Sequence, residues 1–299
     1  MVPKELDGVR VDRALAILLK VSRSVARELV ETGVILDDQP VRANQRVRAG
    51  SVLVAPAPPP PEVLEPEPVP FEVLYEDDHL IVVDKPAGIV VHPGAGHSRG
   101  TLAAGLLYRY PELVGVGAEG RWGLIHRLDR DTSGVLVVAR SEDAYRALTT
   151  MMHNREITRE YLALVEGTFD APTGAIDAPI GRHPTHPTRQ AVVPAGRPAL
   201  TRYEVESAYA EAGCSLLRVT LETGRTHQIR VHFAAIGHPV VGDRVYARAP
   251  AGIASPRIFL HALRVELTHP NTGDHLIAEA PLPEDLVAVL TSLETENRE

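Results

Sequence analysis

Charged side chains crowd a short segment that runs directly into an apolar stretch. Residues 126–140 read "HRLDRDTSGVLVVAR", so Asp129 lies close to Arg127 and Arg130, and a Ser-Gly pair leads into the apolar run 135–139. A carboxylate can act as a nucleophile or stabilise positive charge, and nearby guanidinium groups keep it ionised. The segment is therefore a candidate catalytic loop in front of a buried strand.

Two other interpretations apply to the same carboxylate. Asp129 and Asp131, followed by Thr132, superficially suggest a phosphatase-type acidic pair that holds magnesium. Such loops follow a buried strand, whereas here the apolar run comes afterwards, and no nearby acidic cluster completes a metal shell. Alternatively, Asp129 caps a turn and pairs with a neighbouring arginine. The local pattern leaves the structural and catalytic interpretations open.

The elements that must position this loop follow from the patterns on either side of it. "FEVLYEDDHLIVVDKP" predicts a strand, an acidic turn and a second strand, and "SLLRVTLETG" predicts a strand with Leu217, Val219 and Leu221 on one face. "THQIRVHFAAIG" predicts a helix capped by Thr226 and ended by Gly237, whose inner face carries Ile229, Phe233 and Ile236. Strands do not alternate regularly with long helices, so we expect an α+β body with a mixed sheet.

The N-terminal 54 residues predict a separate small module. "SRSVARELVETG" predicts a helix with Ser22 as N-cap, Gly33 at its end and an apolar stripe of Val25, Ala26, Leu29 and Val30, and short β-like runs follow. Residues 55–70 contain eight prolines, which favour extended chain and forbid a helix. We interpret this segment as a linker; a proline-rich recognition site for a partner is the alternative. The body is expected over 71–290, with a flexible tail over 291–299.

Composition restricts the class of protein. The 299 residues are 44% hydrophobic and 23% charged, and no apolar stretch is long enough to span a bilayer. The single cysteine, Cys214, excludes an intramolecular disulfide and a cysteine-based zinc site. We therefore expect a cytoplasmic protein with no membrane partner.

The charge distribution allows a nucleic-acid partner despite a net charge of -8. Residues 180–203 carry four arginines, two histidines and no acid, and residues 223–248 carry four arginines against one aspartate. Residues 1–54 have a net charge of +2. Local basic patches of this kind bind phosphates even where the whole chain is acidic.

Three motifs in order resemble one enzyme family. "HRLDRDTSG" is similar to the signature of the RluA family of RNA pseudouridine synthases, "REYLALVEG" (159–167) to its second motif, and "LETGRTHQIRVHFAAIGHPVVGD" (221–243) to its third. "FLHALRVELTHP" (259–270) is similar to its C-terminal strand region. The resemblance covers about 71–285 and implies the pseudouridine synthase fold, with a mixed and largely antiparallel sheet.

The N-terminal module resembles an S4 (αL) RNA-binding domain, through "VRVDRALA", "SRSVARELVETG" and "VRANQRVRAGSVLV". The RsuA-type sister family usually has glycine in place of His126. Within the RluA family, "VDKPAGIVVHPGAGHSRGTLAAGLLYRYP" resembles the RluD branch, which modifies large-subunit ribosomal RNA. The resemblance thus implies 23S ribosomal RNA as partner, at the helix 69 stem-loop; an RluC-like or transfer-RNA enzyme, or a non-catalytic S4 RNA-binding protein in ribosome assembly, is the alternative.

The resemblance also implies roles for particular residues. Asp129 corresponds to the catalytic carboxylate, Arg230 to the arginine that pairs with it, and Tyr161 to the tyrosine against the target base. Whether Asp129 attacks C1′ or directs a glycal route stays open. Breaking the N1–C1′ bond and rejoining uracil through C5 needs neither redox change nor an external group, so we expect no cofactor.

Substrate contacts are expected around these three residues. The uridine must leave its stack, and Arg127 is a candidate to fill the vacated space. His126 is expected to be structural rather than catalytic, and the histidines of 221–243 have no zinc-like spacing, so we expect no metal. We expect the enzyme to be a monomer. The remaining candidates for RNA binding are Arg225, Thr226, His227, Arg23 and Arg27.

Overall fold

The computed structural model describes residues 1–19, 21, 23–58, 64–94, 99–118, 120–186, 188–247 and 252–296. The chain divides into two compact units, Met1–Leu64 and Glu65–Glu299, and the division falls inside the proline-rich segment 55–70. Among the described residues, no helix has the length and apolar character needed to cross a membrane.

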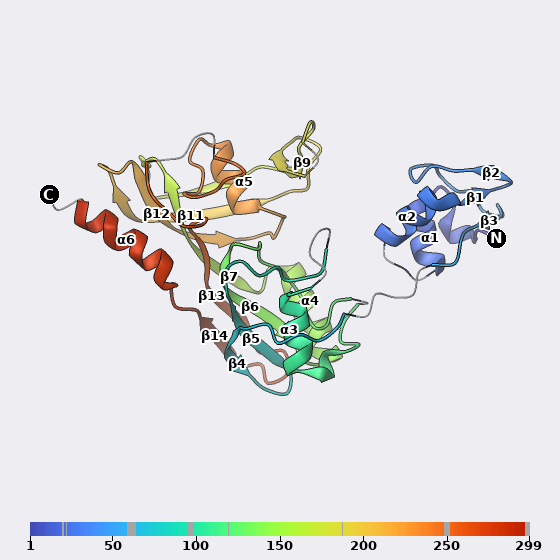
Figure 1. Cartoon of the computed structure of the whole chain (residues 1–299), viewed down its shortest axis with the longest axis horizontal. Helices are drawn as coiled ribbons and strands as arrows, with labels where there is room; N and C mark the ends of the chain where they lie inside the picture. Colours follow the sequence, from blue (N-terminus) through green and yellow to red (C-terminus); the bar gives the residue numbers. More distant parts are fainter. Residues whose placement is uncertain are drawn as a thin grey trace. The chain divides into compact units, whose positions relative to one another are not determined.

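The first unit packs two helices against a small sheet with strand order β2-β1-β3 (Figure 1). Its core includes Val11 and Leu15 from one helix and Ala26, Leu29 and Val30 from the other, so the predicted apolar stripe is confirmed. The helix predicted from Ser22 begins at Arg23, and Ser22 itself lies outside the described residues. The elements are η1 (Lys4–Leu6), α1 (Val11–Leu19), α2 (Arg23–Gly33), β1 (Ile35–Leu36), β2 (Gln39–Pro40) and β3 (Leu53–Val54).

The second unit is built on a nine-stranded sheet in the order β4-β5-β6-β13-β7-β12-β11-β8, with β14 beside β13. Among the described strands only β6 and β13 pair in parallel, so the expected α+β architecture with a mixed, largely antiparallel sheet is confirmed. The strands are β4 (Glu72–Glu76), β5 (Leu80–Lys85), β6 (Ser133–Ala139), β7 (Thr158–Glu166), β8 (Thr173–Asp177), β11 (Leu200–Tyr209), β12 (Cys214–Leu221), β13 (Leu260–Thr268) and β14 (His275–Glu279), with a separate hairpin of β9 (Ile180–Arg182) and β10 (Gln190–Val192).

Helices lie against parts of this sheet and contribute side chains to its hydrophobic cores (Figure 1). Leu148 of α4 packs with Val135 and Val137 of β6, and α6 packs against β7 and β12 through Leu286, Val289 and Leu293. All seven residues of β6 are buried, as expected for an apolar run that follows a polar loop. The helices are α3 (Leu102–Arg109), η2 (Pro111–Leu113), α4 (Glu142–Asn154), α5 (Gln228–Ala235) and α6 (Glu284–Glu296).

Two expectations about helix ends are wrong. The flexible tail expected from residue 291 is helical through Glu296, because Leu293 is buried and anchors the last turns of α6. Helix α5 is capped by His227 rather than by Thr226, since His227 takes a left-handed conformation (φ 57°). The predicted inner face also fails at Ile236, which is 43% exposed because the helix ends at Ala235.

Candidate active site

The loop before β6 is fixed from below by a buried lysine. Lys85, at the end of β5, donates from Nζ to the carbonyl oxygens of Pro86 (2.7 Å), Ile89 (2.9 Å) and Arg130 (3.0 Å). The Gly88 N–H donates to the same Arg130 carbonyl at 2.9 Å. The Lys85 side chain is fully buried. Its hydrogen bonds therefore connect the Asp129 loop to strand β5 inside the protein, away from solvent.

An arginine from the β13 side holds the other end of this loop. Arg257 donates to the Asp131 carbonyl (3.2 Å) and to Ser133 Oγ (3.1 Å), and it pairs with Asp285 at the start of α6. Ser133 Oγ also shares a hydrogen bond with His261 Nδ1 at 2.9 Å. Strand β6, strand β13 and α6 therefore meet at the point where the loop ends.

Arg230 of α5 bridges two carboxylates from different segments. Its Nη1 donates to Asp129 Oδ2 at 2.9 Å, and its Nε and Nη2 donate to the two oxygens of Asp243 at 2.8 and 3.0 Å. The Asp243 side chain is fully buried, and the Arg230 side chain is 11% exposed. Although burial by itself lowers the pKa of Arg230, the hydrogen bonds and charges of Asp243 and Asp129 raise it overall. The guanidinium group is therefore a permanent cation beside Asp129.

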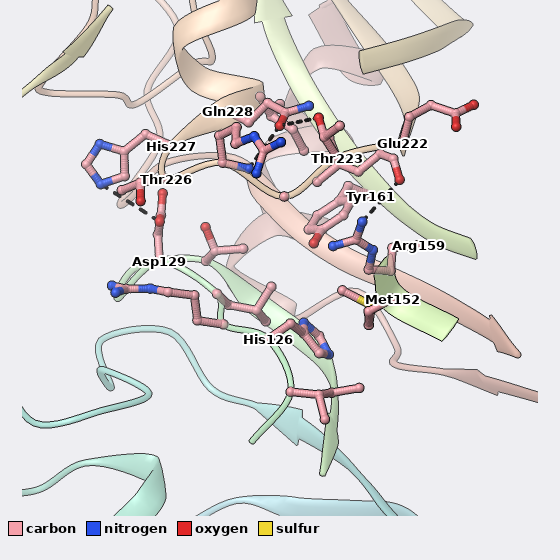
Figure 2. Close-up of a pocket in the computed structure, with 18 of the residues that line it drawn as sticks. His126, Asp129, Met152, Arg159, Tyr161, Glu222, Thr223, Thr226, His227 and Gln228 are labelled. Atoms are coloured by element: carbon pink, nitrogen blue, oxygen red, sulfur yellow. Dashed lines mark hydrogen bonds and ion pairs between the residues drawn. The ribbon is translucent and has the colours of Figure 1, made fainter. Parts of the chain in front are cut away.

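His227 lies on the other side of the Asp129 carboxylate, as Figure 2 shows. Its Nε2 is 3.8 Å from Asp129 Oδ1, and its Nδ1 shares a 2.8 Å hydrogen bond with the Tyr246 hydroxyl. That hydroxyl already accepts from the Gln190 N–H, so its own hydrogen is available to His227 Nδ1. Burial, the largest cause, holds the pKa of His227 below its ordinary value, so the ring is neutral near pH 7 and presents Nε2–H towards Asp129.

Tyr161 comes from the centre of the sheet. Strand β7 lies between β12 and β13, and Tyr161 pairs with Val219 on one side and Ala262 on the other. Tyr161 lines the same cavity as Asp129 and Arg159 (Figure 2). Burial raises the pKa of Tyr161, and the charge of Asp129 adds to the effect, so the phenol is protonated at neutral pH.

His126 has a structural contact in the same loop. Its Nε2 accepts from the Val137 N–H of β6 at 3.0 Å, and no described residue gives its Nδ1 a hydrogen-bond partner. Burial, with a smaller effect from Arg159, lowers the pKa of His126 to about 3. A neutral ring that holds a strand backbone fits the structural role expected for it.

Asp129 and Tyr161 line one cavity of about 620 Å³ together with most of the predicted site residues of the second unit. Gln228 stabilises the turn before α5. Its Oε1 accepts from the Arg225 N–H (3.0 Å) and from the Thr223 hydroxyl (2.8 Å). The remaining predicted residues that line the cavity are His126, Arg127, Arg225, Thr226, His227 and Arg230.

Two predicted substrate contacts belong to the first unit and lie outside this cavity. Arg23 donates twice to Asp12 at 3.1 Å, and Arg27 is 3.7 Å from Glu31 across one turn of α2. Both arginines are exposed, so they are available to a partner of the first unit.

Sequence reasoning missed Asp243, Tyr246 and Lys85. Asp243 is the one acid in the basic stretch 223–248, which is the signal that could have identified it as the partner of an arginine there. Tyr246 and Lys85 carry no such signal, because their roles depend on contacts with His227 and with the Arg130 carbonyl.

The magnesium interpretation of the acidic loop finds no support in the geometry. Asp131 is bound by Arg130 through two hydrogen bonds, at 2.9 and 3.0 Å. Within the described ranges, no three histidine, cysteine or acidic side chains gather as metal ligands would. The carboxylate that faces the cavity is Asp129, and its partners are Arg230 and His227.

Comparison with known proteins assigns the family. A profile of the RNA pseudouridylate synthase family matches residues 79–235. The chain is 45% identical to the ribosomal large subunit pseudouridine synthase D of Nitrosomonas europaea, over 98% of this chain and 86% of that protein. It is 42% identical to the protein of the same name from Pseudomonas aeruginosa, over 98% and 94% of the two chains.

A solved structure agrees in fold. Human RNA Pseudouridylate Synthase Domain Containing 1 superposes with a TM-score of 0.60 at 28% identity, covering 78% of this chain and 96% of that one. The chain therefore belongs to the RNA pseudouridylate synthase family, and the expected RluA-type resemblance is confirmed. It is an enzyme, an isomerase that acts on RNA.

Proposed function

We propose that the enzyme converts uridine to pseudouridine in large-subunit ribosomal RNA, at the helix 69 stem-loop, with Asp129 as its catalytic carboxylate. Support for the substrate comes from the names of the relatives in Nitrosomonas europaea and Pseudomonas aeruginosa, which this chain matches over nearly its whole length. Support for the site comes from the Asp129 geometry.

The observation that carries the proposal is the pairing of Asp129 with Arg230 at 2.9 Å inside a cavity of about 620 Å³. The guanidinium group of Arg230 is a permanent cation, so it gives the Asp129 carboxylate a fixed partner of opposite charge inside the cavity.

The reaction is an isomerisation and balances within the nucleoside. The N1–C1′ bond breaks, uracil turns, a C5–C1′ bond forms, and the proton lost from C5 is matched by one gained at N1. Asp129 either attacks C1′ or removes the C2′ proton to give a glycal. A substrate with deuterium at C2′ distinguishes these routes, because only the second breaks the C2′–H bond and so slows with deuterium.

Tyr161 is assigned to the wall against which the uracil lies. Because the phenol is protonated near neutral pH, it can take the C5 proton only if it passes its own hydroxyl proton to another acceptor. The neutral ring of His227 places its Nε2 3.8 Å from the second Asp129 oxygen, so it lies beside the carboxylate without a direct hydrogen bond.

RNA contacts are assigned to the residues around the cavity and to the first unit. Arg127 is exposed beside Asp129, and we assign it to the space that the flipped uridine leaves in its stack. Arg225 and Thr226 contact the substrate from the turn before α5, and His126 positions β6. The first unit, as an S4 domain, adds affinity through Arg23 and Arg27.

The same proposal covers the setting of the enzyme. Its chemistry requires neither redox exchange nor an external group, so it works without a cofactor. It acts as a monomer in the cytoplasm, where ribosomal RNA is its partner.

The test uses unmodified 23S ribosomal RNA with tritium at C5 of uracil, since pseudouridine formation releases that tritium and binding does not. Wild type is expected to release tritium, and Asp129→Asn is expected to lose at least about 10³-fold in rate while it still binds the RNA. Carbodiimide labelling with primer extension then maps the uridines. Release only from transfer RNA, or from sites outside helix 69, would overturn the substrate assignment.

A further inference from the structure

The cavity wall carries far more positive than negative charge. Among the described residues that line it there are seven arginines and two carboxylates. Arg230 is committed to Asp129 and Asp243, and the other lining carboxylate is Glu222. The remaining arginines therefore exceed the acids available to neutralise them.

Three of these arginines come together from distant segments. Arg155 caps α4, Arg197 lies between β10 and β11, and Arg225 lies between β12 and α5. The Arg225 Nε donates to the Pro198 carbonyl at 3.0 Å, which brings its guanidinium beside the residue that follows Arg197. Burial, and then the charges of Arg197 and Arg155, lower the pKa of Arg225, so both of these cations lie within electrostatic reach of Arg225.

Protein carboxylates leave most of this charge unmatched. Neither Arg197 nor Arg225 has an ion pair within the described part of the chain, and the one bond from the Arg225 side chain goes to a neutral carbonyl. Glu222 is 3.8 Å from Arg155, but it lies closer, at 3.0 Å, to Arg202. Arg225 lines the cavity, and no described residue accepts a hydrogen bond from its terminal nitrogens.

The backbone at Arg155 gives an independent indication. Arg155 has φ 65°, in the left-handed region where a helix end favours glycine. A side chain there costs conformational energy, and the Arg155 backbone N–H already completes the cap by donating to the Met151 carbonyl. Capping alone does not require arginine, so the guanidinium that reaches the cavity serves another purpose.

We propose that Arg155, Arg197 and Arg225 form a phosphate site that binds the RNA backbone beside the target uridine. A guanidinium group binds a phosphate through two parallel hydrogen bonds. Arg197 and Arg225 have no ion pair among the described residues, and Arg155 has only its 3.8 Å contact with Glu222, so binding an anion relieves the mutual repulsion of these cations. The inference rests on the proposed function, and it assigns the phosphate backbone of the RNA substrate to these three arginines. It predicts a contact that is independent of base sequence.

The test measures binding of a fluorescein-labelled oligouridine to the full chain by anisotropy, from about 50 to 200 mM KCl. The binding constant K falls as the salt concentration rises. For a single strand, each lost phosphate contact reduces the magnitude of the slope of log K against log salt concentration by about 0.7. The slope of the Arg155→Gln/Arg197→Gln double variant is therefore expected to be smaller in magnitude than that of wild type by about 1.4, and the variant is expected to bind more weakly. A slope equal to that of wild type would overturn the proposal.

Arg146→Gln is the matched control. Arg146 belongs to the same helix as the Arg155 cap and is 69% exposed, but it pairs with Glu142 and does not line the cavity. Its slope is expected to equal that of wild type. Because Arg146→Gln removes one charge and the double variant removes two, a control that lost about half the slope lost by the double variant would show an effect of net charge and refute the site.

Glu222→Gln tests the site in the opposite direction. Removing the carboxylate that competes for Arg155 is expected to tighten oligouridine binding at low salt, and unchanged or weaker binding would count against Arg155 as a member of the site. In tritium release, the double variant should raise KM and leave kcat close to wild type. Wild type that binds oligouridine but releases no tritium contradicts the proposed function, whereas the slopes decide the phosphate site by themselves.

Discussion

Arg230 shows how a single residue joins two parts of the site. It binds Asp129 through one nitrogen and Asp243 through two, so the buried Asp243 determines where the guanidinium lies. Asp243 also accepts from the backbone N–H groups of Val245 and Tyr246, which fixes its own carboxylate. Tyr246 in turn lies under the Arg230 guanidinium, 5.1 Å from ring centroid to Cζ.

Asp243→Asn is expected to lower kcat for tritium release by about 10- to 100-fold with little change in KM, because Arg230 loses the charge that orients it towards Asp129. Leaving a buried arginine short of a charged partner also lowers the free energy of unfolding, by about 2 kcal/mol or more. Steady-state kinetics and urea unfolding measure the two effects. Arg230→Lys, which retains one charge but cannot bridge both carboxylates, should show the same loss of kcat; full activity in either variant would contradict the positioning role.

At the scale of elements, the site depends on the parallel contact between β6 and β13. Ser133 pairs with His261 and Gly134 pairs with Ala262 in that contact. Gly134 has φ 113°, and a Cβ there would lie 2.1 Å from the Ala262 carbonyl oxygen. The glycine of the "TSG" segment is therefore required for the two strands to approach, directly after the Asp129 loop.

Gly134→Ala is expected to lower the free energy of unfolding by about 3 kcal/mol or more, since both the backbone conformation and the space exclude a side chain. Gly213→Ala is the control, because Gly213 has φ 65° but nothing lies within 4 Å of an added Cβ. It should lose only about 1 kcal/mol, from backbone strain alone. Equal losses in urea unfolding would show that the approach of Ala262 is unimportant.

The turn between β4 and β5 is held by one carboxylate. Asp77 accepts from the backbone N–H groups of His79 and Leu80 at 2.7 and 2.9 Å, from the Tyr75 hydroxyl, and shares a hydrogen bond with His269 Nε2. Burial raises the pKa of Asp77, but these hydrogen bonds outweigh it and lower the pKa to about 2. The folded state therefore favours the ionised form.

Because the folded pKa lies below the ordinary value of 3.8, Asp77 stabilises the fold above about pH 4, and this contribution is lost as the pH falls towards 2. The difference corresponds to about 2 kcal/mol. Asp77→Asn should thus be less stable than wild type at pH 6 by about this amount, and the gap should close in acid. Urea unfolding across the pH range measures it, with Asp78→Asn at the exposed neighbouring position as control; a gap that is constant with pH would contradict the assignment.

At the scale of the whole molecule, the chain consists of two units with separate cores. The core of the first unit is made entirely of residues up to Ala55, and the cores of the second begin with the strands of the large sheet. Among the described residues, all those that line the cavity around Asp129 belong to the second unit. Catalysis and the contribution of the first unit to binding should therefore be separable.

A variant comprising residues 65–299 is expected to fold and to keep the unfolding midpoint that the second unit shows in the full chain. Its KM for RNA should rise, and its salt dependence should weaken, because the basic first unit is missing. Its kcat should stay close to that of the full chain. Circular dichroism and tritium release measure these properties, and loss of folding or of kcat would show that the units depend on each other.

Local pattern was sufficient for much of the fold. Strand β12 alternates as predicted, with Leu217, Val219 and Leu221 buried, and β6 is buried throughout, because side-chain direction along a strand depends only on the neighbouring residues. The expectations for Thr226 and for residues 291–296 of the tail were wrong for the converse reason. Gln228, beside the turn before α5, donates to the Leu200 carbonyl and to Thr201 Oγ1, and Leu293 is buried among residues of the sheet, so both features depend on segments that local pattern does not contain.

The sequence by itself determined the Asp129 loop, the α+β class, the family and the basic segments, since residue type, spacing and periodicity are local properties. Only the tertiary structure decided that Asp243 orients Arg230, that Lys85 and Arg257 hold the loop, and that Arg155, Arg197 and Arg225 line the same cavity. Each of these arrangements brings together residues from different segments of the chain. Such contacts exist only once the strands have paired, because the register and order of the sheet set which distant side chains meet.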